Sequence, residues 1–226
     1  MEYASPHDKL VCNVSSAVSR ATGLDISVRV GRLVGSTAGI FSYTAPSVAS
    51  VTPVGTQGGL VTVTGRSLGV QGMTLLVELD GRRCTNVTYI KEHEQVKCVA
   101  AEGIGGGLDA TARFGDASTS TPDIFSYAAP VVTSVSEVST AGGTITIEGR
   151  SFGSSANHVE VRVGGRKCEG LVVQRSHSVL TCLVAARAFG GSNVAVEVNA
   201  HGMEGEGAMN FSAPNISSIT LSLIHI

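Results

Sequence analysis

Apolar and polar residues alternate along much of this 226-residue chain, and this pattern predicts short β-strands. Between positions 144 and 148, Ile145 and Ile147 alternate with three polar residues. The isoleucines therefore lie on one face of a strand and the polar side chains on the other. No helical period competes with this alternation. We expect both isoleucines to be buried in a core.

Other stretches alternate in the same way and are also predicted to be strands. Glu78 and Arg162 stand between apolar residues in two of these stretches, so we expect them to face solvent. The apolar positions are Val61 and Val63; Leu75, Val77 and Leu79; Val159, Val161 and Val163; Ile26, Val28 and Val30; Ala110, Ala112 and Phe114; and Val194, Val196 and Val198.

An internal repeat with an offset of 84 residues organises the chain. Cys84 recurs as Cys168 and Cys98 recurs as Cys182. Gly-Gly and Gly-Arg-Ser sequences recur at the same offset. Because the repeat is as long as a small domain, each copy is predicted to fold as one domain.

Prolines mark the predicted domain boundaries, because the offset carries Pro46 to Pro130 and Pro130 to Pro214. Residues before Pro46 match only the second half of a unit, and the residues just after Pro214 match only an opening. The last six residues resemble the translation of a sequencing adapter, so we set them aside as an artefact. The predicted parts are half a domain at 1–46, complete domains at 47–130 and 131–214, the start of another at 215–220, and the artefact at 221–226.

Each complete unit is predicted to be an all-β domain, a two-sheet antiparallel sandwich of the immunoglobulin-like type. About seven short strands with Gly-rich turns between them fit this architecture. A domain of this size buries only about 60–65% of its unfolded surface, and a core of Val, Ile and Ala supplies little area per residue. We therefore expect a covalent cross-link to support each domain.

Cysteines are predicted to supply that cross-link, one disulfide in each complete repeat. Cys84 and Cys98 lie in one repeat, and Cys168 and Cys182 lie in the next at the same spacing. Closing such a loop stabilises a domain by about 3 kcal/mol in the chain-entropy model. Cys12 occupies the second-cysteine position, so its partner is expected just upstream of Met1. The alternative is a set of buried free thiols in a cytosolic protein.

Four Asn-x-Ser/Thr sequons agree with the oxidising secretory route that disulfides require. They are more numerous than chance favours in a chain with this Ser and Thr content. The alternative, that any single triplet is unoccupied, stays open. The candidate glycosylation sites are Asn13, Asn86, Asn210 and Asn215.

The repeats resemble the IPT/TIG domain, an immunoglobulin-like fold of the E-set type that plexins, related receptors and some transcription factors share. The family opens with Pro-x-Ile-x-x-Ile and continues with Gly-Gly-Thr-x-Val-Thr-Ile-x-Gly-x-x-Phe-Gly. Residues 130–135 and 141–153 correspond to these two motifs, and Cys168, Cys182 and a closing aromatic residue follow. The likeness covers nearly all of 1–220. Small departures, such as Ser151 where the family often has Asn, leave the subfamily open.

The resemblance implies a non-catalytic, extracellular tandem module of a cell-surface receptor or adhesion-type protein. In extracellular members of the family such modules act as spacers and as protein-binding surfaces. The expected partner is a protein ligand or a neighbouring cell-surface protein. Any membrane anchor or export signal would lie in a segment outside this sequence, since no run approaches the roughly 18 apolar residues that a membrane-spanning helix needs and residues 1–6 lack the features of a signal peptide.

Catalytic motifs are present only superficially. Residues 149–153 and 65–69 match the Gly-x-Ser-x-Gly of hydrolase nucleophile elbows, with His177 or His93 downstream as a candidate base. That motif requires a helix after the serine, whereas a Gly/Ser/Asn stretch and another alternating strand follow here. We expect a β-turn, and no catalytic residue is assigned.

No cofactor or metal site is assigned either. A His-x-x-x-x-Cys spacing recurs at 7–12, 93–98 and 177–182, but it offers two ligands where structural zinc takes four. These histidines are interpreted as turn residues before a strand. The Gly-rich segment 103–107 has no Gly-Lys-Ser/Thr ending and is interpreted as a loop.

Charge and aromatic content narrow the function classes further. Sixteen basic and 18 acidic residues give a formal charge of −2, which argues against nucleic-acid binding and against an intracellular DNA-binding or dimerisation module. An accessory carbohydrate-binding or spacer module of a secreted enzyme is the main alternative. Six Phe, four Tyr and no Trp leave few stacking platforms for sugars.

Overall fold

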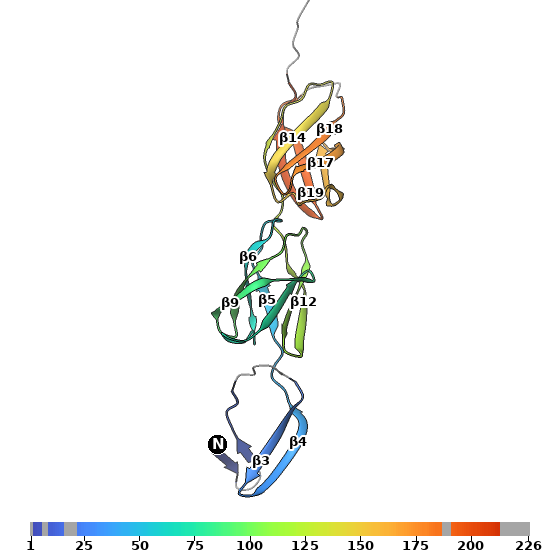
Figure 1. Ribbon diagram of the computed structural model, residues 1–226. Helices are drawn as coiled ribbons and strands as arrows, with labels where there is room; N and C mark the ends of the chain where they lie inside the picture. The colour runs from blue at the N-terminus through green and yellow to red at the C-terminus, as the bar shows by residue number, and fades with distance from the viewer. Residues whose placement is uncertain (1, 6–8, 16–21, 187–190, 213–226) are drawn as a thin grey trace, which may run out of the picture. The chain divides into compact units, whose positions relative to one another are not determined.

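The computed structural model describes residues 2–5, 9–15, 22–186 and 191–212, and for residues 2–5 only the backbone. Within this part the chain contains one short 3-10 helix, η1 (Ala156–His158), no α-helix, and otherwise strands and turns (Figure 1). The predicted all-β class is confirmed. No helix among these residues is long and apolar enough to cross a membrane.

The chain separates into two compact units that do not coincide with the sequence repeats. The first contains residues 1–53, 59–101 and 107–125, and the second contains residues 54–58, 102–106 and 126–226. Two loops of the second repeat, 54–58 and 102–106, therefore pack with the third repeat.

The N-terminal part contains two separate strand pairs. They are formed by β1 (Glu2–Ser5) with β2 (Lys9–Val11) and by β3 (Leu24–Val30) with β4 (Leu33–Phe41). The predicted alternation is present in β3, but Ile26, Val28 and Val30 are 41%, 41% and 66% exposed. No second sheet covers this face among the described residues.

The second repeat is a sandwich of two four-stranded antiparallel sheets. Its strand orders are β5-β6-β10-β9 and β12-β11-β7-β8. The strands are β5 (Ser47–Val51), β6 (Gly59–Arg66), β7 (Leu75–Leu79), β8 (Arg82–Arg83), β9 (Thr85–Lys91), β10 (Gln95–Ala100), β11 (Leu108–Phe114) and β12 (Ala117–Phe125).

The third repeat has the same topology, and its two sheets form the layers of one sandwich in Figure 1. The strand orders are β13-β14-β18-β17 and β16-β15-β19-β20. The strands are β13 (Val131–Val135), β14 (Gly143–Arg150), β15 (Val159–Val163), β16 (Arg166–Lys167), β17 (Glu169–Arg175), β18 (Val179–Val184), β19 (Val194–Ala200) and β20 (Met203–Met209).

The core of the third repeat forms where the alternation predicts it. Ile145 and Ile147 on β14 are fully buried and belong to one cluster with Val161 and Val198 of the opposite sheet. In the second repeat, Val63 on β6 is equally buried. The predicted strand faces of both complete repeats are therefore confirmed.

The Gly-Arg-Ser motif forms a structural loop in both complete repeats. Ser67 and Ser151 have positive φ values of 55° and 62°, and the next residues, Leu68 and Phe152, are fully buried. A Cβ on Gly149 would lie 2.1 Å from the carbonyl oxygen of Val131, so only glycine permits this approach of the two strands. The motif therefore anchors a buried side chain in the core.

The second half of the third repeat is shifted by two residues relative to the sequence repeat. Val161 pairs with Val198, whereas Val77, its counterpart 84 positions earlier, pairs with Ala112. The structural offset in this hairpin is therefore 86 residues. A connection before β19 that is two residues longer creates the shift, and an irregularity in β12 near Asp123 (φ 55°) restores the original offset.

Thr56 joins one of the second-repeat loops to the third repeat within the second unit. Its hydroxyl is 2.8 Å from His177 Nδ1 and accepts a hydrogen bond from the Gly153 backbone N–H at 3.3 Å. His177 Nε2 lies 3.4 Å from Glu102 Oε2. Thr56 is 1% exposed and the His177 side chain 16% exposed, whereas the Glu102 side chain is 62% exposed, so the cluster is closed to water at Thr56 and open to it at Glu102.

Candidate functional site

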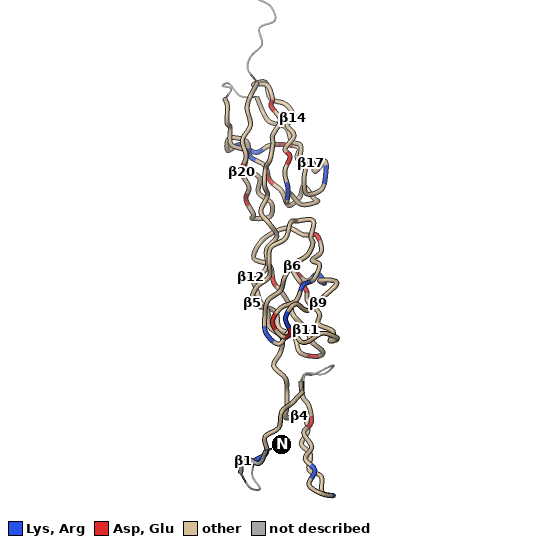
Figure 2. Tube along the Cα trace, turned by 90° about the vertical axis from the view of Figure 1, so that its left-hand side faces the viewer, with Lys and Arg blue, Asp and Glu red and all other residues tan. Residues whose placement is uncertain are grey.

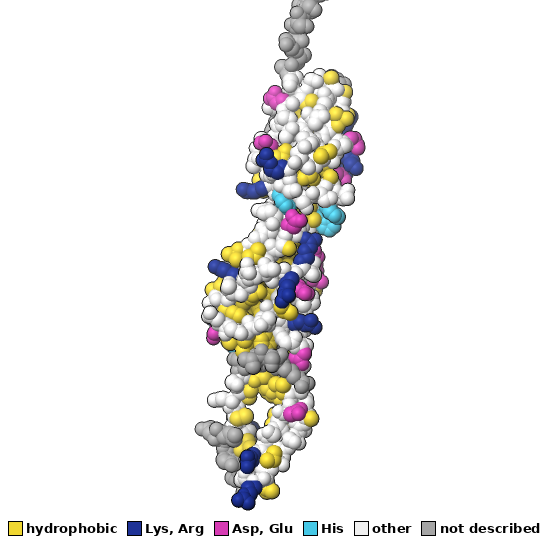
Figure 3. Space-filling view, in the orientation of Figure 1, with side chains coloured by type: hydrophobic (Ala, Val, Ile, Leu, Met, Phe, Trp, Pro, Cys, Tyr) yellow, Lys and Arg dark blue, Asp and Glu magenta, His cyan; other side chains and the backbone are white. Residues whose placement is uncertain are grey.

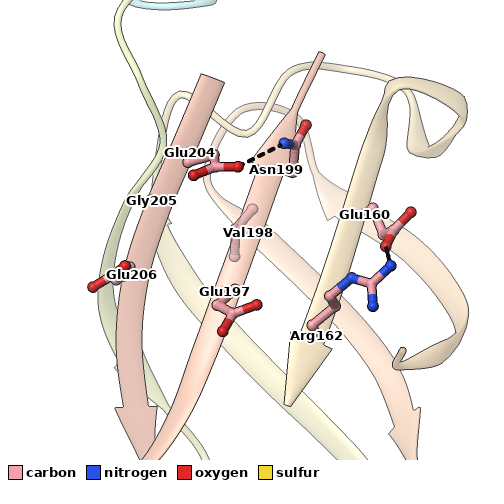
Figure 4. A pocket seen from close by; sticks show the side chains of 8 residues that line it. All are labelled: Glu160, Arg162, Glu197, Val198, Asn199, Glu204, Gly205 and Glu206. Carbon is pink, nitrogen blue, oxygen red and sulfur yellow. Dashed lines mark hydrogen bonds and ion pairs between the residues drawn. The ribbon is translucent and has the colours of Figure 1, made fainter. Parts of the chain in front are cut away.

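A hollowed and charged sheet face lies on β15, β19 and β20 of the third repeat (Figure 4). The hollow has a volume of about 530 Å³. Successive side chains of each strand point alternately outward and into the core. The outward side chains form this surface, while Val161 and Val198 point inward and are each 1% exposed. We call this surface the acidic face, and define it by Glu160, Arg162, Glu197, Asn199, Glu204 and Glu206.

The strand register arranges these side chains in two rows across the sheet. In the first row Arg162 lies opposite Glu197, and Glu197 lies opposite Glu206. In the second row Glu160 lies opposite Asn199, and Asn199 lies opposite Glu204. Each row thus ends in a glutamate on the edge strand β20, along which acidic residues are visible in Figure 2.

Negative charge remains on this face after its internal contacts are made. Arg162 Nη2 pairs with Glu160 Oε1 at 2.7 Å, and Asn199 Nδ2 donates to Glu204 Oε1 at 3.5 Å. Both contacts are drawn in Figure 4. Glu197 and Glu206 form no ion pair with any described residue. Four glutamates and one arginine therefore leave the face acidic.

The matching face of the second repeat is nearly neutral. A smaller hollow of about 250 Å³ lies there. Thr111 and Ser120 stand where the third repeat has Glu197 and Glu206, and the Thr111 hydroxyl donates to Ser120 Oγ at 3.0 Å. The corresponding six positions are Leu76, Glu78, Thr111, Arg113, Ser118 and Ser120.

Sequence reasoning did not find the acidic face. The 84-residue offset aligns Arg113 with Glu197, but the strand pairing places Thr111 at that position. The only available signal was the polar residues between the buried valines of β15 and β19. That pattern does not single out Glu197 from the other outward-facing residues.

The four cysteines of the complete repeats are bonded in pairs. Cys84 pairs with Cys98, and Cys168 with Cys182, with Cα atoms 5.7 and 5.6 Å apart. Each bond ties the residue before β9 or β17 to a central strand of the same sheet. Cys12 is free and exposed.

Three of the four predicted glycosylation sites lie on described residues, and all three are exposed. Asn13 follows β2, Asn86 lies in β9 with φ of 54°, and Asn210 follows β20. Asn210 Oδ1 accepts a hydrogen bond from the Asn193 backbone N–H at 2.8 Å. Asn215 lies outside the described residues.

The candidate hydrolase residues do not form a catalytic arrangement. His177 contacts Thr56 and Glu102, while Ser151 is 3% exposed and is followed by η1 and then strand β15. His93 and His177 occupy the turns before β10 and β18, and each backbone N–H donates to a glycine carbonyl at 2.7 Å. No group of His, Cys, Asp and Glu able to hold a metal occurs among the described residues.

The family model for the IPT/TIG domain matches this chain twice, at residues 46–127 and 130–213. The chain belongs to the IPT/TIG family. The resemblance in the sequence motifs is thereby confirmed, and the immunoglobulin-like sandwich is the fold that the family shares. Both hollowed faces lie within the matched TIG repeats.

Solved structures similar to the tandem TIG repeats include bacterial and receptor proteins. The surface glycan-binding protein of Prevotella bryantii is 17% identical with a TM-score of 0.43, and 74% of this chain and 42% of that chain are covered. SGBP-B from a xyloglucan utilization locus of Bacteroides uniformis is 18% identical with a TM-score of 0.31, covering 73% and 49%. The plexin A4 extracellular region is 19% identical with a TM-score of 0.33, covering 75% and 18%.

The chain thus spans less than half the length of each of these three structures. No curated protein is similar enough to count as a relative.

Proposed function

We propose that this chain is a non-catalytic, extracellular tandem module that acts as a spacer and binds a protein ligand through the acidic face of its third repeat. Two bonded cysteine pairs and exposed sequons support the extracellular location, because disulfides persist in oxidising compartments. The two complete repeats follow each other directly, which suits a spacer.

One observation carries the binding proposal, namely the opposition of Glu197 and Glu206 on neighbouring strands. Like charges directly opposite each other destabilise a sheet. At the same place the second repeat has a hydrogen-bonded Thr111–Ser120 pair, so the fold itself does not require carboxylates there. A partner surface rich in Lys and Arg would relieve this repulsion and would be attracted at long range.

A carbohydrate-binding module is less well supported. Sugar sites of that kind use exposed aromatic rings, and every described Phe and Tyr with a described side chain is buried or half-buried. Phe114, Phe125 and Phe152 are all core residues. The acidic face itself carries no aromatic side chain.

Labelling of intact cells that produce the protein tests its location. A membrane-impermeant amine reagent should modify exposed lysines such as Lys91. Alkylation before and after reduction, followed by peptide mapping, should find Cys168 and Cys182 blocked until reduction. Labelling only after the cells are lysed would contradict the extracellular proposal.

The role of the acidic face is tested by measuring how well the chain, linked into oligomers so that weak binding can be detected, binds to the surface of the same cells. Glu197→Lys with Glu206→Lys should lower binding, while Thr111→Lys with Ser120→Lys, at the same positions of the second repeat, should leave it unchanged. Binding should disappear after the cells are treated with trypsin and survive periodate. Binding that survives trypsin and disappears after periodate would favour a glycan ligand. Equal binding by the two double variants would reject the proposal that the acidic face is the binding site.

A further inference from the structure

Strand β17 of the third repeat lies at an open edge of its sheet (Figure 1). Among the described strands it pairs with β18 alone, so its other side faces no strand. Val172 at the centre of β17 is 48% exposed, and Leu183 on β18 is 52% exposed. Hydrophobic side chains are visible on the third repeat in Figure 3, with charged side chains of both signs at its margins. Exposed strand edges of this kind pair readily with a strand of another chain.

The register with β18 places an acidic, an apolar and a basic residue of β17 on the outer side of the sheet. Glu169, Val172 and Arg175 lie opposite the residues of β18 that alternate with its buried ones, whereas Val173 lies opposite the buried Leu180. One register irregularity on each side of Val172 produces this placement. Glu169 and Arg175 are exposed, and neither forms an ion pair within the described part of the chain. Val172 is therefore flanked at equal distances in sequence by opposite charges.

This order of residues is complementary to itself in an antiparallel arrangement. If two copies of β17 pair around a two-fold axis at Val172, Glu169 of each copy lies beside Arg175 of the other, and the two Val172 side chains meet. Opposite charges and apolar pairs on neighbouring strands both stabilise a sheet. A parallel arrangement would instead place like charges side by side at both ends. The edge therefore selects one orientation of one partner strand.

The corresponding edge of the second repeat does not have this order. On β9 the register with β10 places Thr85, Thr88 and Lys91 outward. Lys91 already has an ion-pair partner at 2.6 Å. Asn86, a candidate glycosylation site, stands where the third repeat has Gly170, and the two residues have positive φ values of 54° and 60°. The fold therefore does not require opposite charges at the two ends of this strand.

We propose that two copies of this chain associate through β17 of their third repeats, in an antiparallel pair centred on Val172. A strand of a different protein is a poorer occupant, because it would have to carry the same charges in the same reversed order. Regular pairing with β18 is confined to Val172 and Val173, so we expect a short backbone pairing between copies, with the charges at the strand ends supplying much of the specificity. β17 and the acidic face lie on different sheets, so the inference does not depend on the proposed binding function.

Charge reversal tests the symmetry of this pairing. Sedimentation of the full chain, with Cys12 alkylated so that its exposed thiol cannot cross-link copies, should show concentration-dependent dimers. Glu169→Arg and Arg175→Glu should each weaken self-association by about tenfold or more, because each places like charges side by side. A mixture of these two variants should dimerise as the wild type does, since opposite charges meet again between them. Lys91→Glu, the matched change on β9, should leave self-association unchanged.

A glycan placed on the edge tests the edge itself, in protein secreted from eukaryotic cells. Gly170→Asn with Val172→Thr creates an Asn-Leu-Thr sequon at the position of Asn86, and asparagine tolerates the positive φ of Gly170. The glycosylated variant should be monomeric, because the glycan blocks the approach of a second strand. Enzymatic trimming of the glycan to its first sugar should restore self-association to the level of Val172→Thr alone.

Four results would overturn the inference. One is a wild-type chain that stays monomeric up to about 1 mM. Another is a mixture of the two charge variants that associates no better than either variant alone. The third is a glycosylated variant that dimerises as the wild type does. The fourth is self-association that Glu197→Lys with Glu206→Lys abolishes and the β17 variants retain, because the acidic face would then be the contact between copies.

Discussion

The second and third repeats share a core and differ on one outer face. Both have the same sheet orders, a disulfide at the same position, and a buried residue after the Gly-Arg-Ser loop. On the β7–β11–β12 face of the second repeat, Thr111 and Ser120 form a hydrogen bond. On the matching face of the third repeat, Glu197 and Glu206 oppose each other. Inward positions thus specify the fold, and outward positions are free to differ in function.

The largest effect should follow from breaking the shared core. Ile147→Asp should destabilise the third repeat by about 4 kcal/mol or more, because it places an unpaired charge at a fully buried site. Val63→Asp should do the same to the second repeat, since Val63 occupies the same position on β6. Hydrogen exchange measured separately for 59–66 and 143–150 would follow each repeat.

Each of these variants serves as the control for the other. Because the cores are separate, Ile147→Asp should leave exchange in 59–66 close to that of the wild type. If Ile147→Asp retained the thermal stability of the wild type, the register assigned to β14 would be wrong.

The alternating pattern predicted these cores but could not detect the shift of β19. A slip of one residue would exchange the buried and exposed faces of a strand, whereas a slip of two restores the same alternation. Val196 and Val198 are therefore buried whether the offset is 84 or 86. The pairing of Glu197 with Arg162 depends on the offset, so the composition of the acidic face required the structure.

The contacts of Thr56 with His177 and Gly153 could not be predicted from the sequence either. Thr56 and Thr140 recur at the same position of successive repeats, and the recurrence alone gives no partner. The recurrent spacing predicts His177 to be a turn residue, and this prediction describes only its backbone. Its side-chain contact with Thr56 joins positions 121 residues apart, a distance over which local patterns carry no information.

A substitution in the second repeat should weaken the third. Thr56→Val keeps the shape of the side chain but leaves the Gly153 N–H and His177 Nδ1 without their partner. We expect a loss of about 1–3 kcal/mol, because buried polar groups that lose a hydrogen bond retain their desolvation cost. Exchange in 149–153 should report this loss.

The matched control for Thr56→Val is Thr140→Val, at the same position of the third repeat. Thr140 is half-buried, and its substitution should change stability by less than about 0.5 kcal/mol. An equal response of 149–153 to both substitutions would rule out a special role for Thr56.

Alkaline pH should lower the stability of the second repeat more than that of the third, and this difference should be smaller than the effects of the substitutions above. Burial raises the pKa of Tyr89 above its ordinary value. The stability contributed by the neutral phenol is thus complete below about pH 10 and is lost as the pH rises through the higher folded-state pKa. Val173 occupies this position in the third repeat and does not ionise.

The readout is the stability of the second repeat between pH 9 and pH 11, with and without Tyr89→Phe. The second repeat of the wild type should lose more stability than that of the variant over this range. The stability of the third repeat should be the same in both proteins. Parallel loss in both proteins would show that Tyr89 is not the titrating group.

The smallest expected effect tests whether the acidic face has a cost to the fold. Glu206→Ser removes the like charge opposite Glu197 and should stabilise the third repeat by about 0.2–0.5 kcal/mol at low ionic strength. The gain should shrink with added salt, since both side chains are exposed. Thr111→Glu with Ser120→Glu should import the same penalty into the second repeat, measured by chemical unfolding. If Glu206→Ser also lowers binding to cells, the carboxylate pair is retained for recognition at the expense of stability.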